Sequence, residues 1–387
     1  MSEWQEFLIE DLADFCNAKR VPLSSMQRQQ LQGSYPYYGA SGIVDYVNDY
    51  IFEGSHVLIS EDGENLKSRN TPIAFEASGK FWVNNHAHIL KAKELHLTKL
   101  IIHYFAQLDL SPYLTGAVQP KLNKATLSKI PLYLPSSIAE QKAIASVLSS
   151  LDDKIDLLHR QNKTLEAMAE TLFRQWFIEE AKEDWEEVTL ADVCTRITDG
   201  SHSSPASVEE GYPMASVKDM YDWGINQATC RKISKEDYEA LVQADCKALQ
   251  GDILIAKDGS YLKHVFLLEK SFDVVLLSSI AMLRPNGRYN PMLLTLFLKL
   301  DSTHESMQNI VTGAVIPRIV LKDFRKFPIQ LPPKDLQDKA IGIVKPIFDK
   351  CWENNRQIQT LENLRDTLLP KLMSGEVRVQ YQTEEVA

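Results

Sequence analysis

Two long stretches of the chain place hydrophobic residues at alternating spacings of four and three residues, a pattern typical of a coiled-coil seam. The first stretch runs through residues 144–176 and the second, less regularly, through residues 341–372. Because a globular segment separates the two stretches, we expect the two helices to pair in antiparallel orientation. The seam positions are Ile144, Leu148, Leu151, Ile155, Leu158, Asn162, Leu165, Ala169, Leu172 and Trp176, and then Ile341, Val344, Phe348, Cys351, Asn355, Ile358, Leu361, Leu364, Leu368 and Leu372.

Two prolines and two asparagines interrupt the helical pattern. Pro346 and Pro370 lie inside the second stretch, and a proline there lacks an amide donor and clashes with the preceding turn. We therefore expect the second helix to be kinked or broken at both positions. Asn162 and Asn355 occupy seam positions, where an asparagine either fixes the register of a coiled coil or is merely tolerated.

Three shorter segments occur twice in the chain, at offsets of 181, 196 and 197 residues. One opens with tryptophan, one is an aliphatic run that ends in Asp-Gly, and one reads Thr-Gly-x-x-x-Pro followed by lysine or arginine. An aliphatic, β-branched run ended by Asp-Gly is typical of a strand and its turn. Duplication of all three predicts two similar domains. The paired segments are Trp4–Leu12 with Trp185–Val193, Val57–Gly63 with Ile253–Gly259, and Thr115–Leu122 with Thr312–Ile319.

The predicted fold is therefore α+β. It has two similar domains of mixed or antiparallel β-sheet with helices, joined by two long antiparallel coiled-coil helices as a pseudo-two-fold repeat. The first of these helices would be roughly 65 Å long at about 1.5 Å per residue. The expected boundaries are 1–136 for the first domain, 137–182 for the central helix, 183–333 for the second domain, 334–376 for the C-terminal helix and 377–387 for the tail.

Size and composition agree with two globular domains. A chain of 387 residues is too long for one core, and 44% hydrophobic with 24% charged residues is an ordinary composition. The five cysteines include no Cys-x-x-Cys pair, so neither a disulfide framework nor a zinc knuckle is expected. The N-terminus lacks the features of a signal peptide, and no apolar stretch reaches the roughly 18 residues that span a bilayer. We expect a cytoplasmic protein that does not contact the membrane.

Taken in order, these motifs resemble the specificity subunits of type I restriction-modification enzymes. The resemblance covers nearly the whole chain, as two α+β domains that are each followed by a long coiled-coil helix. The second domain keeps Tyr212-Pro213 but then departs from the first, which fits two domains that read different half-sites. The motifs are Tyr35–Gly42, Asp199–His202, the duplicated Thr-Gly-x-x-x-Pro segment and Thr367–Glu376.

The resemblance implies a function and a set of partners. Each domain would be a target recognition domain that reads a few base pairs of double-stranded DNA, and the helices would set the distance between two half-sites. Two modification subunits would dock along the helices, carry S-adenosylmethionine and methylate adenine N6. Restriction and translocation would belong to a further subunit. Half-sites one helical turn apart lie about 34 Å apart on one face of DNA, within reach of such helices.

The sequence contains no catalytic motif that we can identify. It has neither an Asp/Asn-Pro-Pro-Tyr/Phe amino-methylation loop nor a Gly-x-x-x-x-Gly-Lys-Ser/Thr phosphate loop. Asn84, His86 and His88 alternate along one segment, so a metal site is one interpretation, but a polar strand face explains them better. We therefore expect a non-catalytic chain with no cofactor or metal of its own. The formal net charge of −10 counts against tight DNA binding by the chain alone.

Candidate DNA contacts lie in the duplicated loops. Base reading needs paired donors or acceptors on short loops, and phosphate binding needs cations or exposed amide hydrogens. Lys121 and Arg318 occupy the same place in the two copies, although an ordinary surface charge is the alternative. The tyrosines either stack on DNA or pack as half-buried strand residues. The full set is Tyr35, Tyr37, Tyr38, Ser41, Asn65, Lys67, Gly116, Gln119 and Lys121, and then His202, Ser203, Lys218, Lys257, Ser260, Tyr261, Gly313 and Arg318.

Contacts with a partner subunit are expected at Arg174, Trp176 and Phe177, because aromatic residues and arginine often anchor interfaces. For Trp176, packing within the helix pair is the alternative. Three rival functions remain open from the sequence. They are a stand-alone coiled-coil DNA-binding regulator, a hydrolase that uses the region of His86 and His88, and a pure interaction scaffold.

Overall fold

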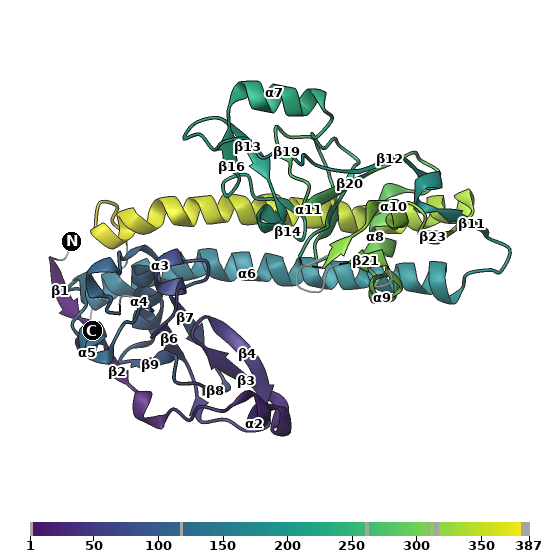
Figure 1. Cartoon of the computed structure of the whole chain (residues 1–387). Coiled ribbons are helices and arrows are strands. Elements are labelled where there is room, and N and C mark those ends of the chain that lie inside the picture. Colours follow the sequence, from purple (N-terminus) through teal and green to yellow (C-terminus); the bar gives the residue numbers. More distant parts are fainter. Residues whose placement is uncertain (1–2, 117–118, 260–262, 308–309, 313–316, 381–387) are drawn as a thin grey trace. The chain divides into compact units, whose positions relative to one another are not determined.

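The computed structural model describes residues 3–116, 119–259, 263–307, 310–312 and 317–380. The chain forms two compact units, residues 1–156 with 359–387 and residues 157–358. Each unit combines a globular head with part of two long helices, α6 (Ile138–Arg174) and α11 (Lys334–Ser374) (Figure 1). A π-helical turn, η3 (Gln175–Glu179), follows α6 directly. We call the part of the first unit before α6 the first head, and the part of the second unit between η3 and α11 the second head.

The first head contains an antiparallel four-stranded sheet in the order β2-β9-β6-β7. A second sheet has the order β4-β3-β8-β5, with β3 and β8 parallel, and β1 pairs with β10. The strands are β1 (Trp4–Leu8), β2 (Ala13–Phe15), β3 (Gln32–Gly39), β4 (Gly42–Val47), β5 (Phe52–Glu53), β6 (His56–Ser60), β7 (Ala74–Ala77), β8 (Lys80–Val83), β9 (Ala87–Ala92) and β10 (Pro131–Pro135). The helices are α1 (Ile9–Leu12), α2 (Ser25–Gln30), α3 (Asn65–Ser68), α4 (Leu95–Gln107) and α5 (Lys124–Ser128).

The second head repeats this plan. Its four-stranded sheet has the order β12-β20-β17-β18, its second sheet the order β16-β13-β19 with β13 and β19 parallel, and β11 pairs with β23. The strands are β11 (Glu186–Thr189), β12 (Cys194–Asp199), β13 (Tyr212–Ala215), β14 (Met220–Tyr221), β15 (Gly224–Ile225), β16 (Arg231–Ile233), β17 (Ile253–Ala256), β18 (Val265–Leu267), β19 (Val275–Leu276), β20 (Ile280–Pro285), β21 (Val311–Thr312), β22 (Arg318–Ile319) and β23 (Pro328–Leu331). The helices are α7 (Lys235–Gln243), α8 (Pro291–Lys299), α9 (Asp301–Met307) and α10 (Leu321–Phe324).

Strand register is also shared by the two heads. In β1–β10 and β11–β23, and again in β6–β9 and β17–β20, residues at equivalent places in the repeat face equivalent partners. The predicted α+β class, with two similar domains and long helices, is therefore confirmed. The matching pairs include Gln5 with Leu134 and Glu186 with Leu331, and Val57 with Leu90 and Ile253 with Leu283.

The central strand of each head is buried on both faces, which explains its continuous aliphatic sequence. In β6, Val57 and Ile59 face one hydrophobic cluster, which includes α4, whereas Leu58 belongs to a second cluster beneath the β3–β8 sheet. In β17, Ile253 and Leu254 divide in the same way. Such a strand cannot end in the core, so its last residue delivers the following Asp-Gly turn to the surface.

A buried glutamine joins each head to the helix that follows it. Gln141 donates from Nε2 to the carbonyl oxygen of Pro135 at 2.8 Å, and Gln337 donates to Pro332 at the same distance. The other amide atom, Oε1, lies 3.0 Å from His96 Nε2 in the first unit and accepts the Asn290 amide at 2.8 Å in the second. The two junctions are thus built alike.

In the first unit, the helix segments run antiparallel. Ile144 and Leu148 of α6 share a hydrophobic cluster with Leu369 and Leu372 of α11. Ion pairs join Asp152 to Arg365 (3.2 Å between Oδ1 and Nη1) and Glu140 to Arg378 (2.8 Å between Oε2 and Nη2).

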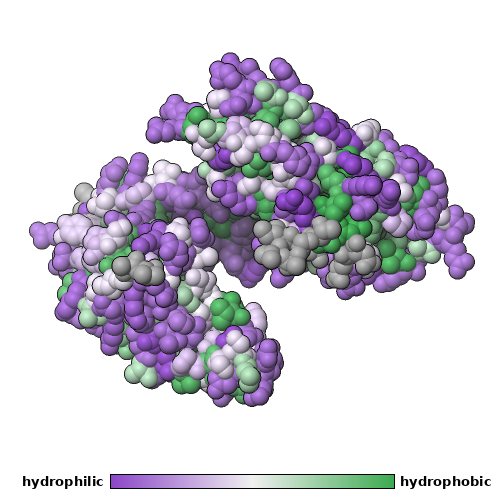
Figure 2. Space-filling view, viewed as in Figure 1, coloured by the Kyte–Doolittle hydropathy of each residue, from purple (hydrophilic) through white to green (hydrophobic). Residues whose placement is uncertain are grey.

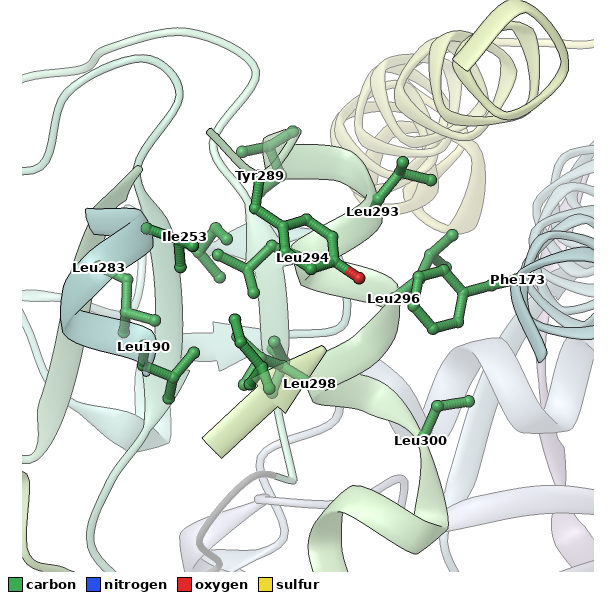
Figure 3. Close-up of a cluster of buried hydrophobic side chains, with 14 of the residues drawn as sticks. Phe173, Leu190, Ile253, Leu283, Tyr289, Leu293, Leu294, Leu296, Leu298 and Leu300 are labelled. Atoms are coloured by element: carbon green, nitrogen blue, oxygen red, sulfur yellow. The ribbon is translucent and has the colours of Figure 1, made fainter. Parts of the chain in front are cut away.

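In the second unit, Asn162 is buried and accepts a hydrogen bond from Asn354 Nδ2 at 2.8 Å. The expected seam asparagine of α11, Asn355, instead donates to the Cys351 carbonyl of its own helix at 2.8 Å. Assigning Asn355 rather than Asn354 to the seam was therefore wrong. Further along the pair, Phe173 packs against leucines of α8 (Figure 3).

The second helix continues through both of its prolines, since α11 is unbroken from Lys334 to Ser374. The expected break at Pro346 and Pro370 is therefore absent. Leu364, a predicted seam residue, is 44% exposed, so the seam is interrupted there. Hydrophilic residues cover most of the visible surface of both units, and the hydrophobic areas between them are smaller (Figure 2).

Candidate nucleic-acid interface

In the first head, the Asp-Gly turn after β6 meets the loop that carries Pro120 and Lys121. The amide of Gly63 donates to the carbonyl of Pro120 at 3.1 Å, and the amide of Leu122 donates to the carbonyl of Glu61 at 2.8 Å. Gly63 has φ +108°, a conformation that favours glycine. Two segments far apart in the sequence thus form one surface feature.

In the second head, the same two segments meet through the same hydrogen bonds. The amide of Gly259 donates to Pro317 at 2.8 Å, and the amide of Ile319 donates to Lys257 at 3.1 Å. The sequence predicts that both loops are duplicated, but it does not predict that they touch. We call the paired loops of each head its cation loop, after Lys121 and Arg318.

The side chains of the first cation loop form a charged chain. Glu61 Oε2 lies 2.6 Å from Arg20 Nη1, and Glu61 Oε1 lies 3.3 Å from Lys121 Nζ. Burial alone raises the pKa of Glu61, but the hydrogen bond from Arg20, with further help from His88 and Lys121, brings this pKa below its ordinary value. Lys121 is half exposed, with 50% of its side chain accessible. An ionised carboxylate thus ties one exposed cation to one largely buried cation.

The second cation loop carries a different arrangement. Lys257 is buried, and its Nζ lies 2.8 Å from Asp199 Oδ2 and 3.6 Å from Asp258 Oδ1. Arg318 lies with Nε 2.9 Å from the same oxygen of Asp258 and keeps 58% of its side chain exposed. Lys257 is therefore an internal ion-pair partner rather than the DNA contact expected from the sequence. A lysine at 4% exposure has no surface to offer to a phosphate.

The predicted tyrosine cluster separates into different environments. Tyr37 is 1% exposed, and its hydroxyl accepts the Leu23 amide at 2.9 Å, so the packing alternative holds and the predicted DNA contact does not. Tyr38 is partly buried against Phe75, and burial raises the pKa of its hydroxyl. Tyr35 is partly exposed and packs against Tyr50 with ring centroids 5.2 Å apart.

Two further first-head candidates support the loops that they belong to. Asn65 bonds the amide and the carbonyl of Thr71, at 2.9 and 3.0 Å, and so shapes its own loop. Gly116 has φ +86°, and a Cβ there would lie 2.2 Å from the carbonyl oxygen of Gln119, so the Thr-Gly turn requires glycine. The candidates Ser41, Lys67 and Gln119 are exposed.

Sequence reasoning missed a histidine beside the first cation loop. His86 Nδ1 lies 2.9 Å from Asp62 Oδ1, and the carbonyl of His86 accepts the amide of Glu61 at 2.9 Å. The neighbouring His88 is buried and is bonded through its Nε2 to the Leu122 carbonyl at 2.7 Å. In the described ranges, no group of three or more His, Cys, Asp or Glu side chains is arranged to hold a metal ion.

Polar second-head candidates surround the second cation loop. His202 has 76% of its side chain exposed, with Nε2 3.3 Å from Asp199 Oδ2. Ser279, which the sequence reasoning missed, accepts the Lys257 amide on its carbonyl at 2.9 Å and the Val217 amide on its hydroxyl at 3.3 Å. Ser203 and Lys218 are exposed nearby in the chain. The remaining candidates, Ser260, Tyr261 and Gly313, lie outside the described residues.

The expected partner contacts at the end of α6 have different fates. Phe177 is 4% exposed and packs against Phe173 and Trp185, with ring centroids 4.9 and 6.2 Å apart, so it is a core residue and not an available interface anchor. Trp176 is half-buried against the same cluster. Arg174 is exposed and lies 3.8 Å from Glu170. Across the part of the chain that the structure describes, no helix is both long and apolar enough to cross a membrane.

Comparisons with known proteins place these heads in a family. The family described as type I restriction modification DNA specificity domain matches residues 1–167 and 182–363. A putative type I restriction enzyme specificity subunit of Haemophilus influenzae, S.HindORF215P, is 38% identical over 149 residues, which are 38% of this chain and 37% of that protein. The MjaIX specificity subunit of Methanocaldococcus jannaschii is 24% identical over 417 aligned residues, covering 98% of this chain and 94% of that one.

Among solved structures, the S subunit of a type I restriction-modification system from M. genitalium superposes with a TM-score of 0.56 at 18% identity, over 96% of each chain. That likeness agrees with the fold described above. The family match extends over both halves of the sequence. The chain therefore belongs to the family of type I restriction-modification DNA specificity subunits.

Proposed function

We propose that this chain reads a bipartite DNA site, with one half-site bound by the cation loop of each head. The observation that carries the proposal is that Lys121 and Arg318 occupy the same backbone position in the two heads, each exposed beside a turn that offers further polar groups. Cations on short, fixed loops suit contacts with phosphates or guanine edges. Different neighbours, such as His86 and His202, would give the two heads different sequence preferences.

We further propose that the paired helices α6 and α11 hold the two heads at a set distance, so that the half-sites flank a spacer that is not read. The support is the antiparallel packing of the two helices found within each unit, together with their lengths of 37 and 41 residues. Domain boundaries at 1–136, 137–182, 183–333 and 334–376 follow from this division of labour.

The catalytic steps are proposed to belong to partner subunits. Two modification subunits would dock on this chain, bind S-adenosylmethionine and methylate adenine N6, and restriction subunits would join them for translocation and cleavage. Exposed Arg174 and half-buried Trp176 are the remaining candidates for such docking. Because the chain has a formal net charge of −10, the modification subunits would supply most of the positive field that DNA binding needs.

The test uses the full chain in complex with its modification subunit. Methylated adenines in DNA from cells that carry the system define the recognised site, and duplexes with this site or a scrambled one are then titrated. Lys121→Ala and Arg318→Ala should each weaken binding to the site by about tenfold and flatten the salt dependence by about one phosphate contact. Assembly of the complex, followed by size-exclusion chromatography, should be unchanged. If both variants bind and methylate like the parent, the contact assignment is wrong.

A further inference from the structure

We propose that Glu61 in the first head and Asp258 in the second are positioning residues that hold the duplicated cations, Lys121 and Arg318, in place for DNA. The inference rests on the proposed function and adds residues that the sequence reasoning did not select. In each head, a carboxylate connects a shielded cation to an exposed one. The order is Arg20, Glu61, Lys121 in the first head and Lys257, Asp258, Arg318 in the second.

The first chain of charges starts from a fixed arginine. Arg20 has 18% of its side chain exposed and donates to the carbonyl oxygen of Ala87 at 2.9 Å as well as to Glu61 at 2.6 Å. Glu61 in turn has only 14% of its side chain exposed. Lys121, at 3.3 Å from Glu61, is therefore tied to a carboxylate that is itself immobilised.

The second chain reaches the same order with residues from other positions. Its shielded cation, Lys257, occupies the place that Glu61 occupies in the first head, and its carboxylate is the next residue, Asp258. Asp258 has 16% of its side chain exposed and lies 2.9 Å from Arg318 Nε. Because the residues are not the equivalents of those in the first head, simple copying of side chains does not explain the common order. A shared requirement for a held cation does.

The physical argument predicts an effect opposite to that of net charge. Removing a carboxylate near DNA should strengthen binding if only long-range electrostatics mattered, since phosphates repel it. A positioning carboxylate instead restricts a long, flexible side chain before DNA arrives, so that less conformational entropy is lost on binding. Its removal should therefore weaken binding although the protein becomes less negative.

The experiment compares Glu61→Gln with Glu64→Gln in the full complex, using the recognised duplex and its scrambled form. Glu64 is an exposed carboxylate in the same loop and serves as the charge-matched control. We expect Glu61→Gln to weaken binding to the recognised duplex by about fivefold to tenfold, and Glu64→Gln to leave it unchanged or slightly tighter. The double variant Glu61→Gln with Lys121→Ala should bind no more weakly than Lys121→Ala alone, because positioning without the cation has no effect.

Each outcome decides one question. If Glu61→Gln binds like the parent or tighter, or if its effect adds to that of Lys121→Ala, the positioning role is refuted while the proposed function stands. If the parent complex does not prefer its duplex over the scrambled one, the proposed function itself fails. Asp258→Asn, with and without Arg318→Ala, repeats the measurement in the second head, so that a folding defect in one variant still leaves an independent test.

Discussion

Glu61 and Lys257 occupy the same position in the two heads, directly after a buried central strand, yet they carry opposite charges. In the first head a carboxylate lies among cationic partners, and in the second an ammonium group lies between two carboxylates. The backbone hydrogen bonds around both residues are the same. The comparison teaches that the duplicated backbone fixes the cation loop, whereas the sign of a shielded charge can change if its neighbours change with it.

The largest expected effect comes from reversing the shielded charge in the second head. Lys257→Glu would place a third carboxylate between Asp199 and Asp258, and an uncompensated buried charge costs roughly 3–5 kcal/mol. We expect a clearly lower midpoint of thermal unfolding, measured by scanning calorimetry. Adding Asp199→Asn to Lys257→Glu should recover part of the loss. An unchanged midpoint for Lys257→Glu would show that the site tolerates either sign without matched neighbours.

A smaller effect is expected at the glutamine junctions, where the two heads are alike. Gln337 is 2% exposed and makes three hydrogen bonds, so Gln337→Ala should lower the free energy of unfolding by about 2–3 kcal/mol. Gln141→Ala, which removes two, should cost about 1–2 kcal/mol. Gln330→Ala, at an exposed position of β23, is the control. Equal, negligible losses at all three glutamines would contradict a structural role for the junctions.

The smallest effect distinguishes the heads by pH. His88 of β9 has its pKa lowered mainly by burial, whereas the equivalent position of β20 is Ala281. Because the folded state resists protonation of His88 more than the unfolded chain does, its stability should fall as the pH drops below about 6.5. Hydrogen exchange at pH 5, corrected for the intrinsic rate, should therefore rise more in β6 and β9 than in β17 and β20. The difference should shrink in His88→Gln, and identical responses of the two sheets would contradict it.

Local patterns predicted the parts of the molecule that depend on local periodicity. The helical seams and the duplicated strands follow directly from spacings of three to four residues and from Asp-Gly turns. The misassigned asparagine has a simple cause, because α11 buries neighbours such as Phe348 with Ile347 and Cys351 with Trp352. A stripe this wide does not define a single seam position.

The candidate site was less predictable, because it depends on contacts between distant segments. Nothing in the sequence near Asp62 indicates that Lys121 will lie against it. The burial of Tyr37 and Lys257 likewise depends on tertiary packing, which residue type alone does not reveal. One signal was available, since aligning the two copies sets Glu61 against Lys257, and a change of sign inside a duplicated motif points to compensating neighbours.

The paired amides of Asn162 and Asn354 have a mechanical consequence. Helices whose contact surface is entirely aliphatic can slide past each other by one heptad and find equivalent neighbours. Here such a slip would leave both amides desolvated against hydrocarbon, without the 2.8 Å bond that they now share. The helix pair of the second unit is thus latched at one setting, as a measuring device must be if it is to give the same reading every time.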